Sequence, residues 1–201
     1  LYSSAASDVY KRQGGKSIMA GFPYFADWGR DTMISLPGCT LALGEYEACK
    51  SILRTFMAYT KEGLMPNLFP EGDALPMYNT VDAALLFLDV VYEYYLETGD
   101  LEFVREAFPV MEDIVFWYQK GTDFHIKMDS DGLIMAGGGL EQVTWMDVRI
   151  DKELPTPRHG KPVEINAYWY NGLRILEKLA PFVGKDGSAY GKLCLLYTSP
   201  S

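Results

Sequence analysis

The sequence is poor in the residues from which many common sites are built. It holds only three cysteines and two histidines among its 201 residues. Three cysteines without a CxxC spacing do not make a disulfide framework, and Cys39 and Cys49 are typical of small buried hydrophobic residues. His125 and His159 stand in unrelated surroundings, so a histidine-based zinc site or a Ser-His-Asp triad has little to build on. We expect no metal, no cofactor, and a reducing, cytoplasmic compartment.

Clustered basic charge and long hydrophobic runs are absent as well. The formal net charge is −9, and Lys and Arg are scattered along the chain. Such a chain would repel a nucleic-acid backbone or an anionic membrane. The apolar runs are interrupted by Asp, Glu, Pro or Gly well before the roughly 20 residues that a membrane span needs. We therefore expect no nucleic-acid partner and no membrane association.

Both ends of the chain lack the patterning of the sequence between them. Residues 1–13 (LYSSAASDVYKRQ) and 194–201 (CLLYTSPS) resemble translated adapter or vector sequence, with disordered natural tails as the alternative. We predict that the domain spans residues 14–193 and that neither end carries chemistry.

The sequence between these ends repeats a pairing of a strongly apolar helix with an amphipathic helix. The expected pairs are 31–43 with 45–61 and 80–97 with 101–120. Thr80 is the expected N-cap of the second apolar helix. Pro109 is expected to divide the second amphipathic helix, because proline lacks the amide hydrogen that a helix interior uses.

A short β-hairpin then interrupts the helical pattern. Residues 124–128 and 133–136 flank the turn sequence Asp129-Ser-Asp-Gly132, and a third helix runs from Glu164 to about Ala180. Buried helices alternating with outer amphipathic helices suit a double-layered toroid better than a simple bundle. The predicted fold class is all-α: a partial (α/α)6 toroid, with about five helices of twelve and a small β-hairpin insertion.

Polar and aromatic residues gather where the apolar helices are expected to begin. They are Asp27, Trp28, Arg30 and Asp31; Asn79 and Asp82; Trp145 and Asp147; and Glu164, Asn166 and Trp169. In a toroid the N-terminal ends of the inner helices meet at one rim, so these residues would converge on one pocket. Carboxylates and amides bond to hydroxyl groups, and indoles stack on the apolar face of a sugar ring. The pattern predicts a sugar-binding pocket.

The same stretches resemble a known family. GRDTMISLPG (29–38), GLMPNLFPEG (63–72), YNTVDAALLF (78–87), TWMDV (144–148) and PVEINAYWYN (162–171) are similar to the glucosidase domain of glycogen debranching enzymes. This is the amylo-α-1,6-glucosidase family, which is related in fold to the glucoamylases. The resemblance is collinear over about residues 16–183. It implies inverting hydrolysis of α-1,6-linked glucose in a branched α-glucan, glycogen or limit dextrin, by one carboxyl group that protonates the leaving oxygen and a second that activates water.

The resemblance assigns Asp147, in the TWMD motif, as the general acid, with a plain acid in a polar turn as the alternative. Trp145 and Trp169 are expected to reduce its solvation and favour its protonated form. The base would lie in sequence that this chain does not contain, so the chain alone is expected to be inactive. Glu164 is the best internal candidate for a base, with a sugar-binding, acid-supporting or simple helix-start role as its alternatives.

The expected substrate contacts are Trp28, Arg30, Asp31, Asn79, Asp82, Trp145, Glu164, Asn166 and Trp169. For Arg30 the structural alternative is an ion pair with Asp31 or Asp27 beside a core tryptophan. Asn79 binds a hydroxyl group or caps a helix, and Asp82 serves as a pocket acid or as a partner of the helix dipole.

Other functions share these features. Another toroidal glycosidase, glucoamylase-like or trehalase-like, would share the fold, and a non-catalytic carbohydrate-binding or helical scaffold domain would share the pocket. Two weaker motifs are set aside. Gly14-Gly-Lys-Ser17 lacks the first glycine of a phosphate-binding loop. Residues 129–132 match only part of a calcium-binding loop, and a hairpin turn explains their sequence.

Overall fold

The structure, a computed structural model, describes residues 9–12, 15–21, 25–69 and 75–198. Residues 1–8, 13 and 199–201 of the two predicted tails lie outside this description. In the rest of those tails, a strand covers Val9–Arg12 and the last helix runs to Thr198. The predicted domain boundaries stay a prediction.

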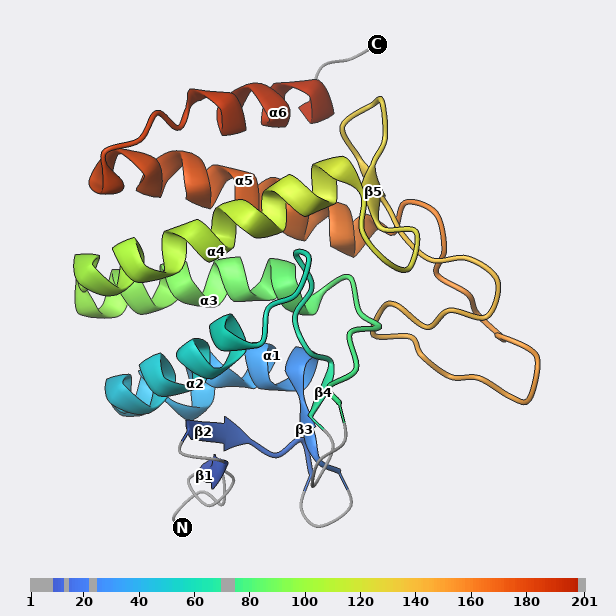
Figure 1. The fold of residues 1–201 in the computed structure, drawn as a ribbon, viewed down its shortest axis with the longest axis horizontal. Helices are drawn as coiled ribbons and strands as arrows, with labels where there is room; N and C mark the ends of the chain where they lie inside the picture. The colour runs from blue at the N-terminus through green and yellow to red at the C-terminus, as the bar shows by residue number, and fades with distance from the viewer. Residues whose placement is uncertain (1–8, 13–14, 22–24, 70–74, 199–201) are drawn as a thin grey trace.

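Most of the described chain is helical (Figure 1). The α-helices are α1 (Gly29–Cys39), α2 (Tyr46–Ala58), α3 (Ala83–Thr98), α4 (Leu101–Lys120), α5 (Val163–Leu179) and α6 (Ser188–Thr198), with short 3-10 helices η2 (Leu41–Leu43) and η3 (Ala180–Val183). The strands are β1 (Val9–Arg12), β2 (Gly15–Ile18), β3 (Asp27–Trp28), β4 (Leu68–Phe69), β5 (Lys127–Met128) and β6 (Ile134–Met135). They pair in sequence order as three two-stranded antiparallel sheets. The predicted hairpin is thus present as β5 and β6. None of the helices in the described residues is long and apolar enough to cross a membrane.

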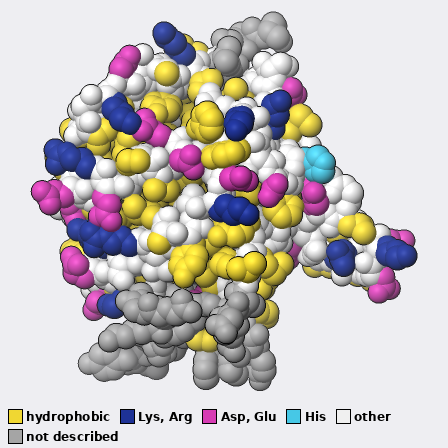
Figure 2. Space-filling model, in the orientation of Figure 1, with side chains coloured by type: hydrophobic (Ala, Val, Ile, Leu, Met, Phe, Trp, Pro, Cys, Tyr) yellow, Lys and Arg dark blue, Asp and Glu magenta, His cyan; other side chains and the backbone are white. Residues whose placement is uncertain are grey.

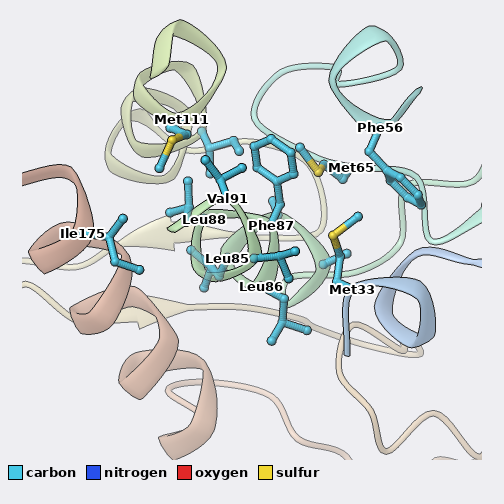
Figure 3. Close-up of a cluster of buried hydrophobic side chains, with 14 of the residues drawn as sticks. Met33, Phe56, Met65, Leu85, Leu86, Phe87, Leu88, Val91, Met111 and Ile175 are labelled. Carbon is cyan, nitrogen blue, oxygen red and sulfur yellow. The ribbon is translucent and has the colours of Figure 1, made fainter. Parts of the chain in front are cut away.

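Helix α3 lies at the centre of the fold. It packs between α1 and α5, α2 and α4 pack against it too, and α6 packs on α5 (Figure 1). Its first six residues are all buried. Figure 3 shows its side chains among Met33 of α1, Met111 of α4 and Ile175 of α5. The prediction of a buried helix here is confirmed, while closure of the helices into a ring stays a prediction.

Helices α1, α3 and α5 begin at the same end of the molecule. In Figure 1 their N-terminal ends lie on the side where the long loops gather, and α2 and α4 run in the opposite direction. This arrangement agrees with the expectation that the polar residues ahead of these helices share one rim.

Helix α4 is continuous, and the predicted division at Pro109 is wrong. Pro109 is exposed, and so is Arg105, whose carbonyl group loses its helical partner there, so this group lies on the side of the helix that water reaches. Phe108 and Met111 beside it are buried in the core. Packing of this buried face keeps the helix continuous through the proline.

The N-cap of α3 is Asp82 and not the predicted Thr80, and no side chain caps the helix. The Thr80 hydroxyl group donates to the Asp82 carboxylate instead. Helix α4 has the side-chain cap, because Asp100 Oδ1 accepts a hydrogen bond from the Phe103 amide at 2.9 Å. Gly99 closes α3 with a φ of 68°, which glycine adopts readily.

Helix α1 differs from the predicted helix 31–43 in its bounds and its burial. It begins at Gly29 and ends at Cys39. Met33 and Leu36 are buried, but Ile34 is 60% exposed. Ile34 is therefore largely open to solvent, although the apolar sequence of 31–43 predicted a buried helix.

Gly29→Ala is expected to destabilise the protein strongly. A Cβ atom at Gly29 would lie 1.9 Å from the Pro66 carbonyl oxygen and 3.2 Å from Cε1 of Phe56. The backbone would have to move, at about 3 kcal/mol or more. Denaturant unfolding measures the loss.

The matched control is Gly38→Ala in the same helix. A Cβ atom at Gly38 meets nothing within 4 Å, so alanine there is expected to be neutral or to stabilise by up to about 1 kcal/mol. Equal unfolding midpoints for the two variants would contradict the close approach of Gly29 to Pro66.

Candidate functional site

A two-residue sheet fixes the segment ahead of α1. Strand β3 pairs with β4, so that Asp27 faces Phe69 and Trp28 faces Leu68. The Gly29 amide then donates to the Asn67 carbonyl at 2.8 Å. This pairing buries Asp27 completely and leaves Trp28 half-buried at the start of the helix.

A second anchor brings the loop that carries Asp147 to the start of α3. The Val81 amide donates to the Val143 carbonyl at 2.8 Å. The Asn79 side chain donates to the Gln142 carbonyl at 3.4 Å, and the Gln142 side chain donates to the Asp147 carbonyl. Val81 and Asn79 therefore both link the start of α3 to this loop.

Arg30 joins the two anchored segments. Its side chain is only 8% exposed, and its Nε lies 2.6 Å from Oδ2 of Asp82, which is also buried. Its Nη2 donates to the Thr80 hydroxyl at 3.3 Å, and its Nη1 lies 3.5 Å from Oδ2 of Asp147. Arg30 thus forms ion pairs with carboxylates 52 and 117 positions away in sequence.

A pocket of about 500 Å³ opens beside this cluster. Five of the predicted site residues line it: Trp28, Arg30, Asp31, Trp145 and Asp147. Ala20, Phe25 and Ile34 also line it, and they were not predicted as contacts. Ile34 follows Asp31 by three helical positions, so the spacing that puts both on one face was available in the sequence. The pocket combines two indoles, two carboxylates and one guanidinium group.

Asp147 lies in a wetter environment than the sequence predicts. Its side chain is 45% exposed, and Trp145 is 57% exposed. Trp169 is buried in the core, stacked on Tyr118 with ring centroids 6.1 Å apart. In this structure the two indoles do not shield the carboxyl group from water.

Asn166 and Trp169 tie the β5–β6 hairpin to α5. Asn166 accepts from the Ile134 amide at 2.7 Å and donates to the Ile134 carbonyl at 3.1 Å. Trp169 Nε1 donates to the Gly132 carbonyl at 3.1 Å. Neither residue lines the pocket, and their predicted contact with substrate stays a prediction.

A lysine occupies the turn that echoes a calcium loop. Lys161 Nζ lies 2.6 Å from Oδ2 of Asp129 and 2.7 Å from Oδ2 of Asp131. An ammonium group therefore already sits between these carboxylates. Across the described ranges, no group of three or more His, Cys, Asp or Glu residues could hold a metal ion.

Glu164 is paired with Arg158, which the sequence did not single out. Arg158 donates to both carboxylate oxygens, from Nε to Oε1 at 2.8 Å and from Nη2 to Oε2. Trp145 Nε1 also donates to Oε1, at 3.2 Å. Burial raises the pKa of Glu164, but the hydrogen bonds and the charge of Arg158 outweigh burial, so the pKa is lowered from its ordinary value. Glu164 is therefore ionised at neutral pH and is not a proton donor.

Residues 148–157 form a loop that projects from the helices next to Asp147 (Figure 1). We call it the projecting loop. Arg149, Asp151 and Lys152 on it are exposed, and Figure 2 shows side chains of both charges together at its tip.

Comparison with known proteins identifies the family. Residues 3–196 match the family described as amylo-alpha-1,6-glucosidase. A glycogen debranching enzyme of Saccharomyces cerevisiae (strain ATCC 204508 / S288c) is 30% identical over 223 residues, which cover 81% of this chain and 14% of the yeast protein. The chain belongs to the amylo-α-1,6-glucosidase family, as the sequence motifs indicated.

A solved structure shares the fold. The crystal structure of a GH78 family rhamnosidase of Bacillus sp. GL1 matches with a TM-score of 0.54 and 17% sequence identity, over 84% of this chain and 16% of the rhamnosidase chain. At this identity the likeness concerns the fold alone. The chain spans less than a fifth of either relative.

Proposed function

We propose that the chain is part of a glycoside hydrolase that releases α-1,6-linked glucose from the branch points of glycogen or limit dextrin, with inversion of configuration. The whole protein is called the intact enzyme below. Family membership supports the substrate class. The observation that carries the proposal is the pocket, which joins Trp28, Arg30 and Asp31 to Trp145 and Asp147 from a distant part of the chain.

Asp147 is the proposed general acid. Its protonated carboxyl group would give its proton to the glycosidic oxygen as the bond to glucose breaks. Arg30, 3.5 Å from Oδ2 of Asp147, would stabilise the carboxylate that remains. Asp82 and Thr80 hold Arg30 from behind, so we propose that Asp82 acts through Arg30.

The sugar ring would lie between the aromatic walls of the pocket. Trp28 and Trp145 offer indole faces, and the exposed Asp31 accepts hydrogen bonds from hydroxyl groups. Asn79 would act through the loop it anchors, and Asn166 and Trp169 through the hairpin they hold. The indoles of Trp28 and Trp145 and the carboxylate of Asp31 suit a neutral, hydroxyl-rich ligand.

The second carboxylate is proposed to lie outside the 201 residues. Inverting hydrolysis needs a base roughly 6.5–9.5 Å from the acid, with room for a water molecule between them. Glu164 is bound on both oxygens by Arg158, which makes it a poor proton acceptor. The α-helices described above are then proposed to be part of an (α/α)6 ring whose other helices supply the base.

Substrate profiling of the intact enzyme tests this proposal. We expect glucose from α-1,6-branched limit dextrin, released first as the β-anomer, and little from linear maltodextrin or trehalose. The 201-residue chain assayed beside it is expected to release none, because it lacks the base. Preference for maltodextrin or trehalose would favour a glucoamylase-like or trehalase-like enzyme, and glucose release by the chain alone would contradict a base outside it.

A further inference from the structure

Trp145 is held on two sides by a charged pair outside the pocket lining. The guanidinium carbon of Arg158 lies 5.5 Å from the centroid of its ring, within the range of a cation–π contact. The indole Nε1 donates to Oε1 of Glu164 at 3.2 Å. The guanidinium group of Arg158 lies over the ring, and the carboxylate of Glu164 accepts a hydrogen bond from the ring edge. These two contacts fix the indole although it is largely exposed.

Arg158 is the centre of this arrangement. It binds both oxygens of Glu164 and stands over Trp145 at the same time. A planar guanidinium group can do both, whereas a lysine ammonium group is a single point charge. The side chains of Arg158 and Glu164 are 32% and 21% exposed, so water screens their pairing only in part.

Fixing Trp145 orders one wall of the pocket. Trp145 lines the pocket, and it stands two positions before Asp147 in the same loop. A free exposed indole would sample several rotamers and would lose entropy on packing against a sugar. An indole already held in place avoids that loss.

We propose that Arg158 is a positioning residue, which fixes the Trp145 indole as a wall of the pocket and so sets the affinity for the glucosyl unit. The inference rests on the proposed function for the identity of the ligand, but not for the fixing of Trp145. Arg158 does not line the pocket, so it would act on the sugar only through Trp145.

Arg158→Met tests the proposal, because methionine keeps an unbranched stem and removes the guanidinium group. In the intact enzyme, KM for branched dextrin is expected to rise by between about tenfold and about a hundredfold, with a smaller change in kcat. Arg158→Lys is expected to recover only part of this loss.

The matched control is Arg54→Met. Arg54 also binds both oxygens of a glutamate, Glu106, at 2.8 and 2.7 Å, and lies 5.8 Å from the ring centroid of Phe103. It does not line the pocket. A KM for Arg158→Met no higher than that of Arg54→Met would overturn the proposal.

A measurement that does not depend on catalysis tests the positioning role of Arg158 separately from the proposed function. In the 201-residue chain labelled with 5-fluorotryptophan, the Trp145 fluorine signal is assigned by Trp145→Phe. Arg158→Met is expected to shift and narrow that signal, and Arg54→Met is expected to leave it in place. An unmoved signal in Arg158→Met would overturn the positioning role. If the signal moves but the wild-type enzyme releases no glucose, the proposed function fails and the fixing of Trp145 by Arg158 stands.

Discussion

Asp147→Asn in the intact enzyme is expected to lower glucose release from α-1,6-branched limit dextrin by about 10²- to 10⁴-fold, the usual range for loss of a general acid. Asparagine has nearly the same shape, and its amide oxygen can still face Nη1 of Arg30. It has no acidic proton to give to the leaving oxygen. Glucose binding is expected to persist, because the two indoles and Asp31 remain. Initial rates and the inhibition constant for glucose measure the two effects.

Asp151→Asn is the matched control for this experiment. Asp151 is an exposed aspartate on the projecting loop, four positions after Asp147, and it does not line the pocket. Its φ of 50° lies in the left-handed region, which asparagine tolerates well. We expect wild-type activity. Undiminished turnover by Asp147→Asn, or loss of glucose binding together with turnover, would contradict the role assigned to Asp147.

Arg30→Met is expected to destabilise the chain by about 3–5 kcal/mol, because it removes one partner of a buried ion pair. Asp82, only 5% exposed at its side chain, would lose the cation beside it. The hydrogen bonds and ion pairs that Arg30 makes to Thr80, Asp82 and Asp147 would be lost with the guanidinium group. Chemical denaturation of the 201-residue chain measures the change in the free energy of unfolding.

Two further variants distinguish the cost of leaving a buried charge unpaired from a non-specific loss of stability. Arg54→Met removes an exposed pair, with side chains 49% and 40% exposed, and is expected to cost no more than about 1 kcal/mol. Arg30→Met combined with Asp82→Asn is expected to recover part of the loss, because the stranded charge is gone. Equal losses for Arg30→Met and Arg54→Met would contradict the structural role of Arg30.

The helices were predictable because their causes are local. The amphipathic pattern of 45–61 and the apolar run of 80–97 contain most of the information that forms α2 and α3. The hairpin follows from its Asp-Gly turn. The predicted division of α4 at Pro109 was wrong because the sequence does not show whether water can bond to the carbonyl group that loses its helical partner. Burial of α1 was overestimated because the sequence does not show that Ile34 lines an open pocket and not the core.

The sequence predicted which residues belong to the candidate site better than it predicted the contacts between them. Trp145 and Asp147 belong to a motif that the family resemblance singles out, and Trp28 directly precedes another. The partners of Arg30 lie 52 and 117 positions away, so no local spacing identifies them. Arg158 lies outside every recognised motif, and its role depends on the fold of the segment between Asp147 and α5.

The most direct test of the central claim compares two leaving groups in the intact enzyme. Fluoride leaves α-D-glucosyl fluoride without help from an acid, whereas the glycosidic oxygen of a branched dextrin needs a proton. For Asp147→Asn we predict a loss on branched dextrin at least about tenfold greater than the loss on α-D-glucosyl fluoride. Equal losses on the two substrates would show that Asp147 is not the proton donor, and would contradict the mechanism proposed for this pocket.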